Sequence, residues 1–139
     1  MRMTEEEYRR IFGTPPKKSK YNNQKPEYYD PDLKETLKFD SKKEFEYYLI
    51  LKDREKRGEI RDLERQVSFT IQEAFTMPTG EKIKAITYKA DFVYLEKNAD
   101  PEIALQYLRK IVDVKGCKTE VYKLKKKLLA YRGIYIEEV

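Results

Sequence analysis

The pattern of hydrophobic and polar positions predicts helices on both sides of a central run of strands. Thr4 and Glu7 have the spacing of a capping box, which predicts a short helix near the N-terminus. Asp40 or Ser41 can cap a second helix, whose apolar residues recur at helical spacing as far as about Arg57. Two helices are therefore expected before the strands begin.

Alternating apolar and polar residues predict the strands that follow. Residues 67–75 and 83–95 each alternate, and a turn between them makes a hairpin. A third strand ends at Lys115, and residues 134–136 form a last strand after a helix capped by Thr119. That helix carries an apolar stripe at the spacing of a packed face, made of Val121, Leu124, Leu128 and Tyr131.

The predicted order is helix, three strands, helix and strand. This order indicates an α/β (α+β) fold with a mixed β-sheet flanked by helices. A chain of 139 residues is long enough for one domain, which we expect at residues 39–139. Residues 1–38 are expected to form an N-terminal arm, with the short helix and a small hairpin around residues 30–32.

The composition excludes several kinds of chemistry. The absence of His rules out Ser-His and Cys-His hydrolases, and nucleases that use a His base or His metal ligands. A single Cys excludes an internal disulfide and a thiolate zinc site. Any hydrolysis must therefore use carboxylates, Lys, Tyr and a bound ion. The net charge of +5 suits a polyanionic partner, although 25 acidic residues offset most of the 30 basic ones.

The run at residues 111–116 carries an acid and a base in a strand that is otherwise β-branched. Strand side chains alternate with a period of two, so Asp113 and Lys115 point to the same side. Burying a carboxylate and an ammonium group at this place is costly. The two residues are explained either by an ion pair at the strand end or by a functional site.

Two further acids stand out in the sequence. Asp91 lies in mid-strand, where Asp is disfavoured by propensity and by burial. Glu44 lies at the rim of the apolar face of the second helix, although Glu46 is only two residues away. If the strands that carry Asp91 and Asp113 are neighbours, their carboxylates lie side by side and cannot both stay ionised without a cation.

Such a pair of carboxylates predicts a site for Mg²⁺ or Mn²⁺, with the carbonyl oxygen of Val114 as a further ligand. An ion of this kind polarises a phosphate and lowers the pKa of a water that it binds. Lys115 could orient that water or stabilise the developing charge, and Glu44 would hold a water ligand from the helix side. The set is complete for phosphodiester hydrolysis without any His.

These residues resemble the motif of the PD-(D/E)XK nuclease superfamily, which has an acid on the first helix, then an Asp, then an acid-x-Lys pair. Asp113, Val114 and Lys115 fit the second half of the motif, and Asp91 follows an Ala where the superfamily has Pro. The resemblance implies a restriction-endonuclease-like core, in which Asp91, Asp113, Lys115 and Glu44 are the catalytic residues.

The wider sequence is also similar to a phage-borne family of small uncharacterised proteins. This similarity covers about residues 39–139 and rests on four separated stretches, residues 39–44, 63–66, 86–92 and 112–116. Superfamily members that cut at transposon ends place a Gln before the strand that follows the helix, and Gln66 matches that position. The resemblance therefore gives Gln66 a secondary catalytic role. A strand-start residue that bonds to the backbone explains it about equally well.

The final helix is rich in lysine and directly follows the strand that carries Asp113. A run of charges on a helix is usually a solvated face. Because this helix follows the predicted site, its lysines are also candidates for phosphate contacts, which give salt-sensitive affinity without sequence preference. The candidates for nucleic-acid binding are Lys118, Lys123, Lys126 and Lys127.

The sequence thus predicts a Mg²⁺- or Mn²⁺-dependent DNA endonuclease with little sequence specificity, and the resemblance implies a phage role in recombination, replication or DNA processing. One alternative is a Holliday junction resolvase-type nuclease, for which a homodimer is compatible with the fold. Others are a non-catalytic DNA-binding protein that kept the fold, and an RNA nuclease. Without a signal peptide or a long apolar run, we expect a cytoplasmic protein, in a bacterial host cell if phage-encoded, with no membrane contact.

Overall fold

The computed structural model describes residues 4–12, 25–114 and 118–139, so that Lys115 lies outside the described residues. The chain divides into two compact units, residues 1–57 and residues 58–139. The second helix therefore groups with the N-terminal segment, whereas the predicted division falls between residues 38 and 39. None of the described helices is long and apolar enough to cross a membrane.

The first unit has two helices and a hairpin, whose bounds are α1 (Glu5–Phe12), β1 (Glu27–Asp30), β2 (Glu35–Lys38) and α2 (Lys42–Lys56). The capping box that begins α1 is confirmed, because the amide of each of Thr4 and Glu7 donates to the other side chain at 3.1 Å. The hydroxyl of Ser41 caps α2 by accepting the amide of Glu44. The predicted hairpin is also confirmed, with β1 antiparallel to β2.

A buried acid ties this hairpin to α2. Asp30 is 1% exposed and accepts the hydroxyl of Tyr48 at 2.5 Å and the amide of Asp32 at 2.8 Å. The ammonium group of Lys52 lies 3.9 Å from the same carboxylate. Burial alone would raise the pKa of Asp30, but the hydrogen bonds from Tyr48, Asp32 and Leu33 and the charge of Lys52 outweigh burial and lower the pKa. The Asp30 carboxylate is therefore ionised and fully bonded.

The second unit is a mixed sheet with one helix, which confirms the predicted α+β class. Its sheet has the order β3-β6-β7-β8, antiparallel except for the parallel pair of β7 and β8. The elements are β3 (Ile60–Gln72), β4 (Phe75–Thr76), β5 (Lys82–Ile83), β6 (Ile86–Lys97), β7 (Tyr107–Asp113), α3 (Glu120–Tyr131) and β8 (Ile136–Glu138).

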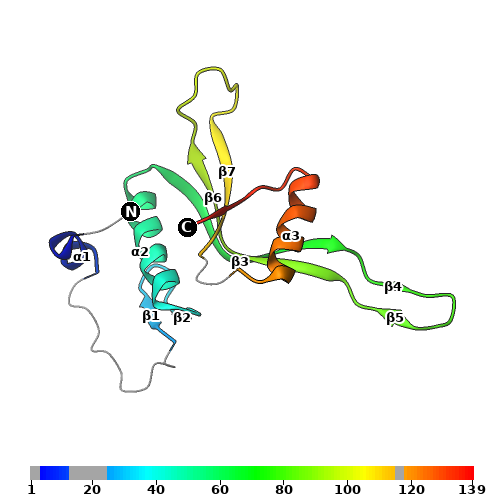
Figure 1. Ribbon diagram of the computed structural model, residues 1–139. Coiled ribbons are helices and arrows are strands. Elements are labelled where there is room, and N and C mark those ends of the chain that lie inside the picture. Colours follow the sequence, from blue (N-terminus) through cyan, green and yellow to red (C-terminus); the bar gives the residue numbers. More distant parts are fainter. Residues whose placement is uncertain (1–3, 13–24, 115–117) are drawn as a thin grey trace. The chain divides into compact units, whose positions relative to one another are not determined.

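Strand β3 is longer than predicted. The sequence predicts a connection at residues 59–65, but Ile60, Arg61, Glu64 and Arg65 pair with the far half of β6 and extend the sheet. Alternation did not predict this part of the strand because most of its residues are polar. Backbone pairing with β6 does not require apolar side chains. Beyond the sheet, β3 and β6 continue into the small hairpin of β4 and β5, which projects away from α3 (Figure 1).

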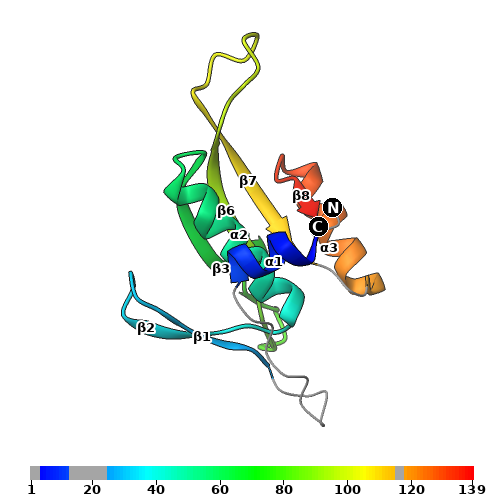
Figure 2. The same cartoon turned by 90° about the vertical axis from the view of Figure 1, so that its left-hand side faces the viewer.

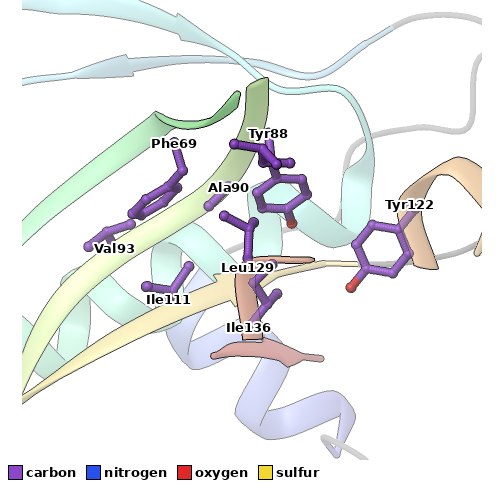
Figure 3. Close-up of a cluster of buried hydrophobic side chains, with 9 residues drawn as sticks. Phe69, Tyr88, Ala90, Val93, Ile111, Tyr122, Leu129 and Ile136 are labelled. Carbon is purple, nitrogen blue, oxygen red and sulfur yellow. The ribbon is translucent and has the colours of Figure 1, made fainter. Parts of the chain in front are cut away.

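The core of the second unit lies where α3 meets the sheet (Figure 3). Strands β3, β6, β7 and β8 all contribute side chains to it. The buried cluster consists of Phe69, Ile71, Tyr88, Ala90, Val93, Ile111, Tyr122, Leu129 and Ile136. The ammonium group of Lys125 also donates to the carbonyl oxygen of Thr87 at 2.9 Å, which fixes α3 against β6.

The orientation of α3 differs from the sequence pattern. Tyr122 and Leu129 are buried, whereas the predicted apolar stripe of Val121, Leu124, Leu128 and Tyr131 is exposed. Spacing alone shows that four apolar residues share a face, but it does not show which face packs on the sheet. Tyr122 and Leu129 lie seven residues apart and form a second apolar face, and this second face fills the core.

Candidate metal centre

The structure brings Asp91 and Asp113 together at the point where β6 and β7 lie side by side. The register pairs Phe92 with Val112, so Asp91 and Asp113 are the next two residues across the two strands. The carboxylate of Asp91 accepts the amide of Val114, just beyond β7, at 2.9 Å. The sheet thus holds two carboxylates on neighbouring strands, and the condition on which the predicted site depended is met.

Asp113 is almost fully enclosed. Its side chain is 1% exposed and accepts the hydroxyl of Tyr88. Its carbonyl oxygen accepts the amide of Val139 at 3.0 Å, which joins the end of β7 to β8 (Figure 2). A buried carboxylate needs such donors or a cation, because the charge loses its hydration on burial. Tyr88, which the sequence did not single out, is therefore part of this site.

Gln66 lies across from Asp91 on the other neighbouring strand. The pairs of Arg65 with Phe92 and of Val67 with Ala90 place Gln66 opposite Asp91. The backbone of Gln66 has φ 53°, in the left-handed region that residues other than Gly rarely adopt within a strand. Strained backbone of this kind is common at functional sites, and here it lies beside the candidate ligand.

The strained residue coincides with a break in side-chain alternation along β6. Strict alternation predicts that Ala90 and Val93 lie on opposite faces of the sheet, but both belong to the buried cluster beside α3. The prediction for the faces of this strand is wrong at that point. The break occurs at Asp91, opposite the left-handed Gln66, while the register of β3 and β6 continues without a shift on both sides.

Exchange of Gln66 is expected to reveal this strain. Gly adopts φ 53° without steric cost, whereas Ala retains the cost, so Gln66→Gly should be more stable than Gln66→Ala by about 1 kcal/mol. At an ordinary strand position the Ala variant would be the more stable of the two. Urea unfolding of the two variants measures the difference, and a more stable Ala variant would contradict the strained backbone.

A third acid, Glu138, lies next to Asp113 on β8, on the side opposite the strand of Asp91. Strand β8 places Glu138 in register with Asp113. Its carboxylate binds the ammonium groups of Lys118, at 2.5 Å, and of Lys126. These two hydrogen bonds lower the pKa of Glu138 to about 2. The sequence pattern missed Glu138, although its spacing of two from Ile136 places it on the buried side of the last strand.

The low pKa of Glu138 predicts that the folded protein loses stability in acid. Its pKa falls from an ordinary value of 4.5 to about 2 on folding, so its ion pairs stabilise the protein above pH 4.5 and are lost as the pH falls toward 2. Glu138→Gln should make stability depend less on pH in that window. Urea unfolding at several pH values compares the two proteins. Equal slopes in both would contradict the two ion pairs.

The pKa of Tyr122 on α3 is affected by the negative charges of the site. Burial, followed by the charge of Glu138 and then those of Asp113 and Asp91, raises the pKa of the Tyr122 hydroxyl well above its ordinary value. All three carboxylates thus act on one hydroxyl group. A bound cation would relieve the potential that they create.

The carboxylates of Asp91 and Asp113 are the candidate ligands for a divalent ion of the magnesium type. Within residues 4–12, 25–114 and 118–139, no group of three Asp, Glu, Cys or His side chains is arranged to hold a metal. Two carboxylates, Asp91 and Asp113, are nevertheless sufficient, because Mg²⁺ is usually bound through one or two carboxylates, with water and substrate phosphate completing its shell. The carbonyl oxygen of Val114 is the third ligand that the sequence predicts.

Two of the predicted catalytic residues are not placed at this pair. Lys115 lies outside the described residues. Glu44 belongs to the first unit and is 3% exposed, so it is a buried residue of α2 rather than one at the rim. The helix dipole stabilises a negative charge in the first turn of a helix and so offsets part of the cost of burying Glu44, which offers a structural explanation. The roles of Glu44 and Lys115 stay predictions.

The four predicted phosphate-binding lysines have different surroundings. Lys118 and Lys126 both bind Glu138, and Lys123 binds Glu120 at 3.2 Å. Lys127 is exposed. Two of the four charges are therefore paired with Glu138, which is in register with Asp113, although both side chains keep contact with solvent. Binding of a phosphate by Lys118 or Lys126 would have to compete with Glu138.

Comparison with known proteins identifies a family. No curated protein and no solved structure matches the chain. The family described as "Protein of unknown function (DUF1064)" matches residues 18–138, which include Glu44, Gln66, Asp91, Asp113 and Glu138. Since the match covers most of the chain, the protein belongs to the DUF1064 family.

Proposed function

We propose that this protein is a metal-dependent nuclease that hydrolyses phosphodiester bonds in DNA. The observation that carries the proposal is the position of Asp91 and Asp113 as opposed residues of β6 and β7. Two neighbouring carboxylates form a site that attracts a cation. No His is available in the chain, so a carboxylate-bound ion is the means by which these residues could hydrolyse a phosphodiester.

The order of the elements supports the same proposal. Helix α2, the antiparallel strands β3, β6 and β7, helix α3 and strand β8 follow one another along the chain. This order resembles the helix, three-stranded meander, helix and strand of the PD-(D/E)XK superfamily. Asp91 and Asp113 lie on the second and third strands of the meander, in the order of the superfamily motif.

Each residue of the site has a distinct task in this proposal. When bound by Asp91 and Asp113, Mg²⁺ or Mn²⁺ would polarise the phosphodiester and activate the attacking water. The amide of Val114 and the hydroxyl of Tyr88 fix the two carboxylates by hydrogen bonds. By the motif, Lys115 acts on the water.

The pH dependence of cleavage is a further prediction. A water nucleophile attacks as hydroxide, so the rate should rise with pH as the hydroxide fraction grows. We expect an increase from about pH 6 to about pH 9 under single-turnover conditions. A flat profile over the same range would contradict attack by an activated water.

A panel of labelled DNA substrates tests the proposed function. Duplex, single-stranded, flap and four-way junction DNA are each incubated with Mg²⁺, with Mn²⁺ and with a chelator, with an RNA duplex beside them. The wild type is compared with Asp113→Asn, which keeps an acceptor for the Tyr88 hydroxyl. We expect cleavage of DNA that requires the metal and is lost in the variant.

Each other outcome of the panel leads to a definite conclusion. Preference for the four-way junction would identify a junction resolvase-type enzyme, and cleavage of RNA alone would change the substrate class. Binding of DNA without cleavage in either metal would contradict the nuclease and would favour a DNA-binding protein that has kept the acids.

A further inference from the structure

The outward side of α3 is unusually apolar. Val121, Leu124, Leu128 and Tyr131 are all exposed, and Tyr131 is 93% exposed. Their spacing of three, four and three residues gives one continuous stripe, which we name the α3 apolar face. Single exposed apolar residues are common on protein surfaces, but a continuous row of four marks an interaction site.

The α3 apolar face is a second face of a helix that is already packed. Tyr122 and Leu129 fill the core on one side, and Lys125 bonds to the carbonyl oxygen of Thr87. The helix therefore cannot rotate to bury Leu124 without losing those contacts. A partner must come to the α3 apolar face from outside the second unit.

We infer that a second copy of this chain covers the α3 apolar face, through antiparallel pairing of the two α3 helices about a two-fold axis. With Leu124 of each copy at the axis, Val121 of one copy meets Leu128 of the other. Both copies then bury the same three side chains in successive layers, and Tyr131 covers the end of the contact. The face is self-complementary in this arrangement.

The charges beside the α3 apolar face agree with this pairing. In an antiparallel helix pair, residues on one flank of the stripe face the same flank of the partner. Glu120 and Lys127 lie on one such flank, so Glu120 of each copy faces Lys127 of the other. Within the part of the chain that the structure describes, Lys127 has no acidic partner, while Glu120 has only the exposed Lys123. On the other flank Lys125 faces Lys125 of the other copy, and the bond of its ammonium group to the carbonyl oxygen of Thr87 in its own chain holds it toward the sheet.

The mass of the full-length protein in solution tests this inference without DNA or metal, so the result is independent of the proposed nuclease function. Sedimentation equilibrium of the wild type should give twice the chain mass of 16.8 kDa. Leu124→Glu places two carboxylates at the axis and should give the monomer mass. The matched control is Lys82→Glu, at an exposed position of β5 outside the α3 apolar face, which should remain dimeric.

A charge exchange tests the antiparallel register. Glu120→Lys and Lys127→Glu each place like charges opposite one another. The dimer of each single variant should therefore be weaker and dissociate at a higher protein concentration than the wild type. The double variant restores opposite charges and should regain the wild-type dimer. A parallel pair would bring neither residue opposite the other, and no such rescue would occur.

Two results would overturn the inference. One is a wild type that stays monomeric at every concentration, and the other is a Leu124→Glu variant that is still dimeric. If the wild type is monomeric and Leu124→Glu also lowers its thermal midpoint, another part of the same chain covers the α3 apolar face. Circular dichroism confirms that each variant is folded before its mass is compared.

Discussion

Asp91→Asn is expected to lower the rate of Mg²⁺-dependent DNA cleavage about 10³-fold. The Asn oxygen can still accept the Val114 amide, which lies 2.9 Å from the Asp91 carboxylate, so the contact is kept while the negative charge is lost. The expected loss corresponds to about 4 kcal/mol of transition-state stabilisation, at about 1.36 kcal/mol per tenfold change. Single-turnover cleavage of the DNA that the wild type cuts best measures the effect.

The matched control for this prediction is Asp100→Asn. Asp100 lies in the loop after β6, is exposed, and undergoes the same chemical change. Its variant should cleave DNA like the wild type, and both variants should unfold at the wild-type temperature. If Asp91→Asn cleaved DNA as fast as the control, Asp91 would be a structural residue and the proposed centre would be wrong.

Asp30→Ala is expected to destabilise the first unit by about 3 kcal/mol. The change leaves the buried hydroxyl of Tyr48 and the amide of Asp32 without their acceptor, and it removes the charge that faces Lys52. Loss of one member of a buried, hydrogen-bonded network costs more than the network contributes as a whole. Hydrogen exchange of the amides of α2 follows the unfolding of this unit by itself.

Asp32→Ala is the control for the buried acid. Asp32 also lies near Lys52, at 3.6 Å, but its side chain is mostly exposed, so its loss should cost less than about 1 kcal/mol. An effect of Asp30→Ala as small as that of Asp32→Ala would mean that the hydrogen bonds of Asp30 contribute little to the stability of this unit.

Features that depend on neighbouring residues were predictable from the sequence. The helices begin where Thr4, Ser41 and Thr119 accept hydrogen bonds from amides three residues later, and each of these caps was expected. The first hairpin and the antiparallel pair of β3 and β6 followed from alternation and turn residues in the same way. Backbone geometry within one turn of chain decides all of these features.

The candidate pair was predicted on the condition that the strands of Asp91 and Asp113 are neighbours, and the register of β6 and β7 meets that condition. The hydrogen-bond donors to the acids were not predictable. Tyr88 is 25 residues from Asp113, and its hydroxyl reaches the carboxylate only after the sheet has formed. Glu138 lies beside Asp113 because β8 pairs with β7 in parallel, and the order of elements along the chain does not specify this pairing.

The packing of α3 shows why spacing alone is insufficient. The helix has two apolar faces, and the stripe of Leu124 and Leu128 is the more regular of the two. Tyr122 and Leu129 pack instead, because Tyr122 fills the space beside Tyr88 with ring centres 6.1 Å apart. Only the shape of the sheet surface decides between the two faces.

The most direct test of the metal centre is paramagnetic line broadening in the NMR spectrum of the ¹⁵N-labelled protein. Sub-stoichiometric Mn²⁺ should broaden first the amide signals around Asp91, Asp113 and Val114, because the effect falls steeply with distance from the ion. The Asp91→Asn/Asp113→Asn double variant should lose this local broadening and keep its folded spectrum. Broadening that is equal in both proteins, or that is centred elsewhere in the chain, would contradict a metal site at these two carboxylates.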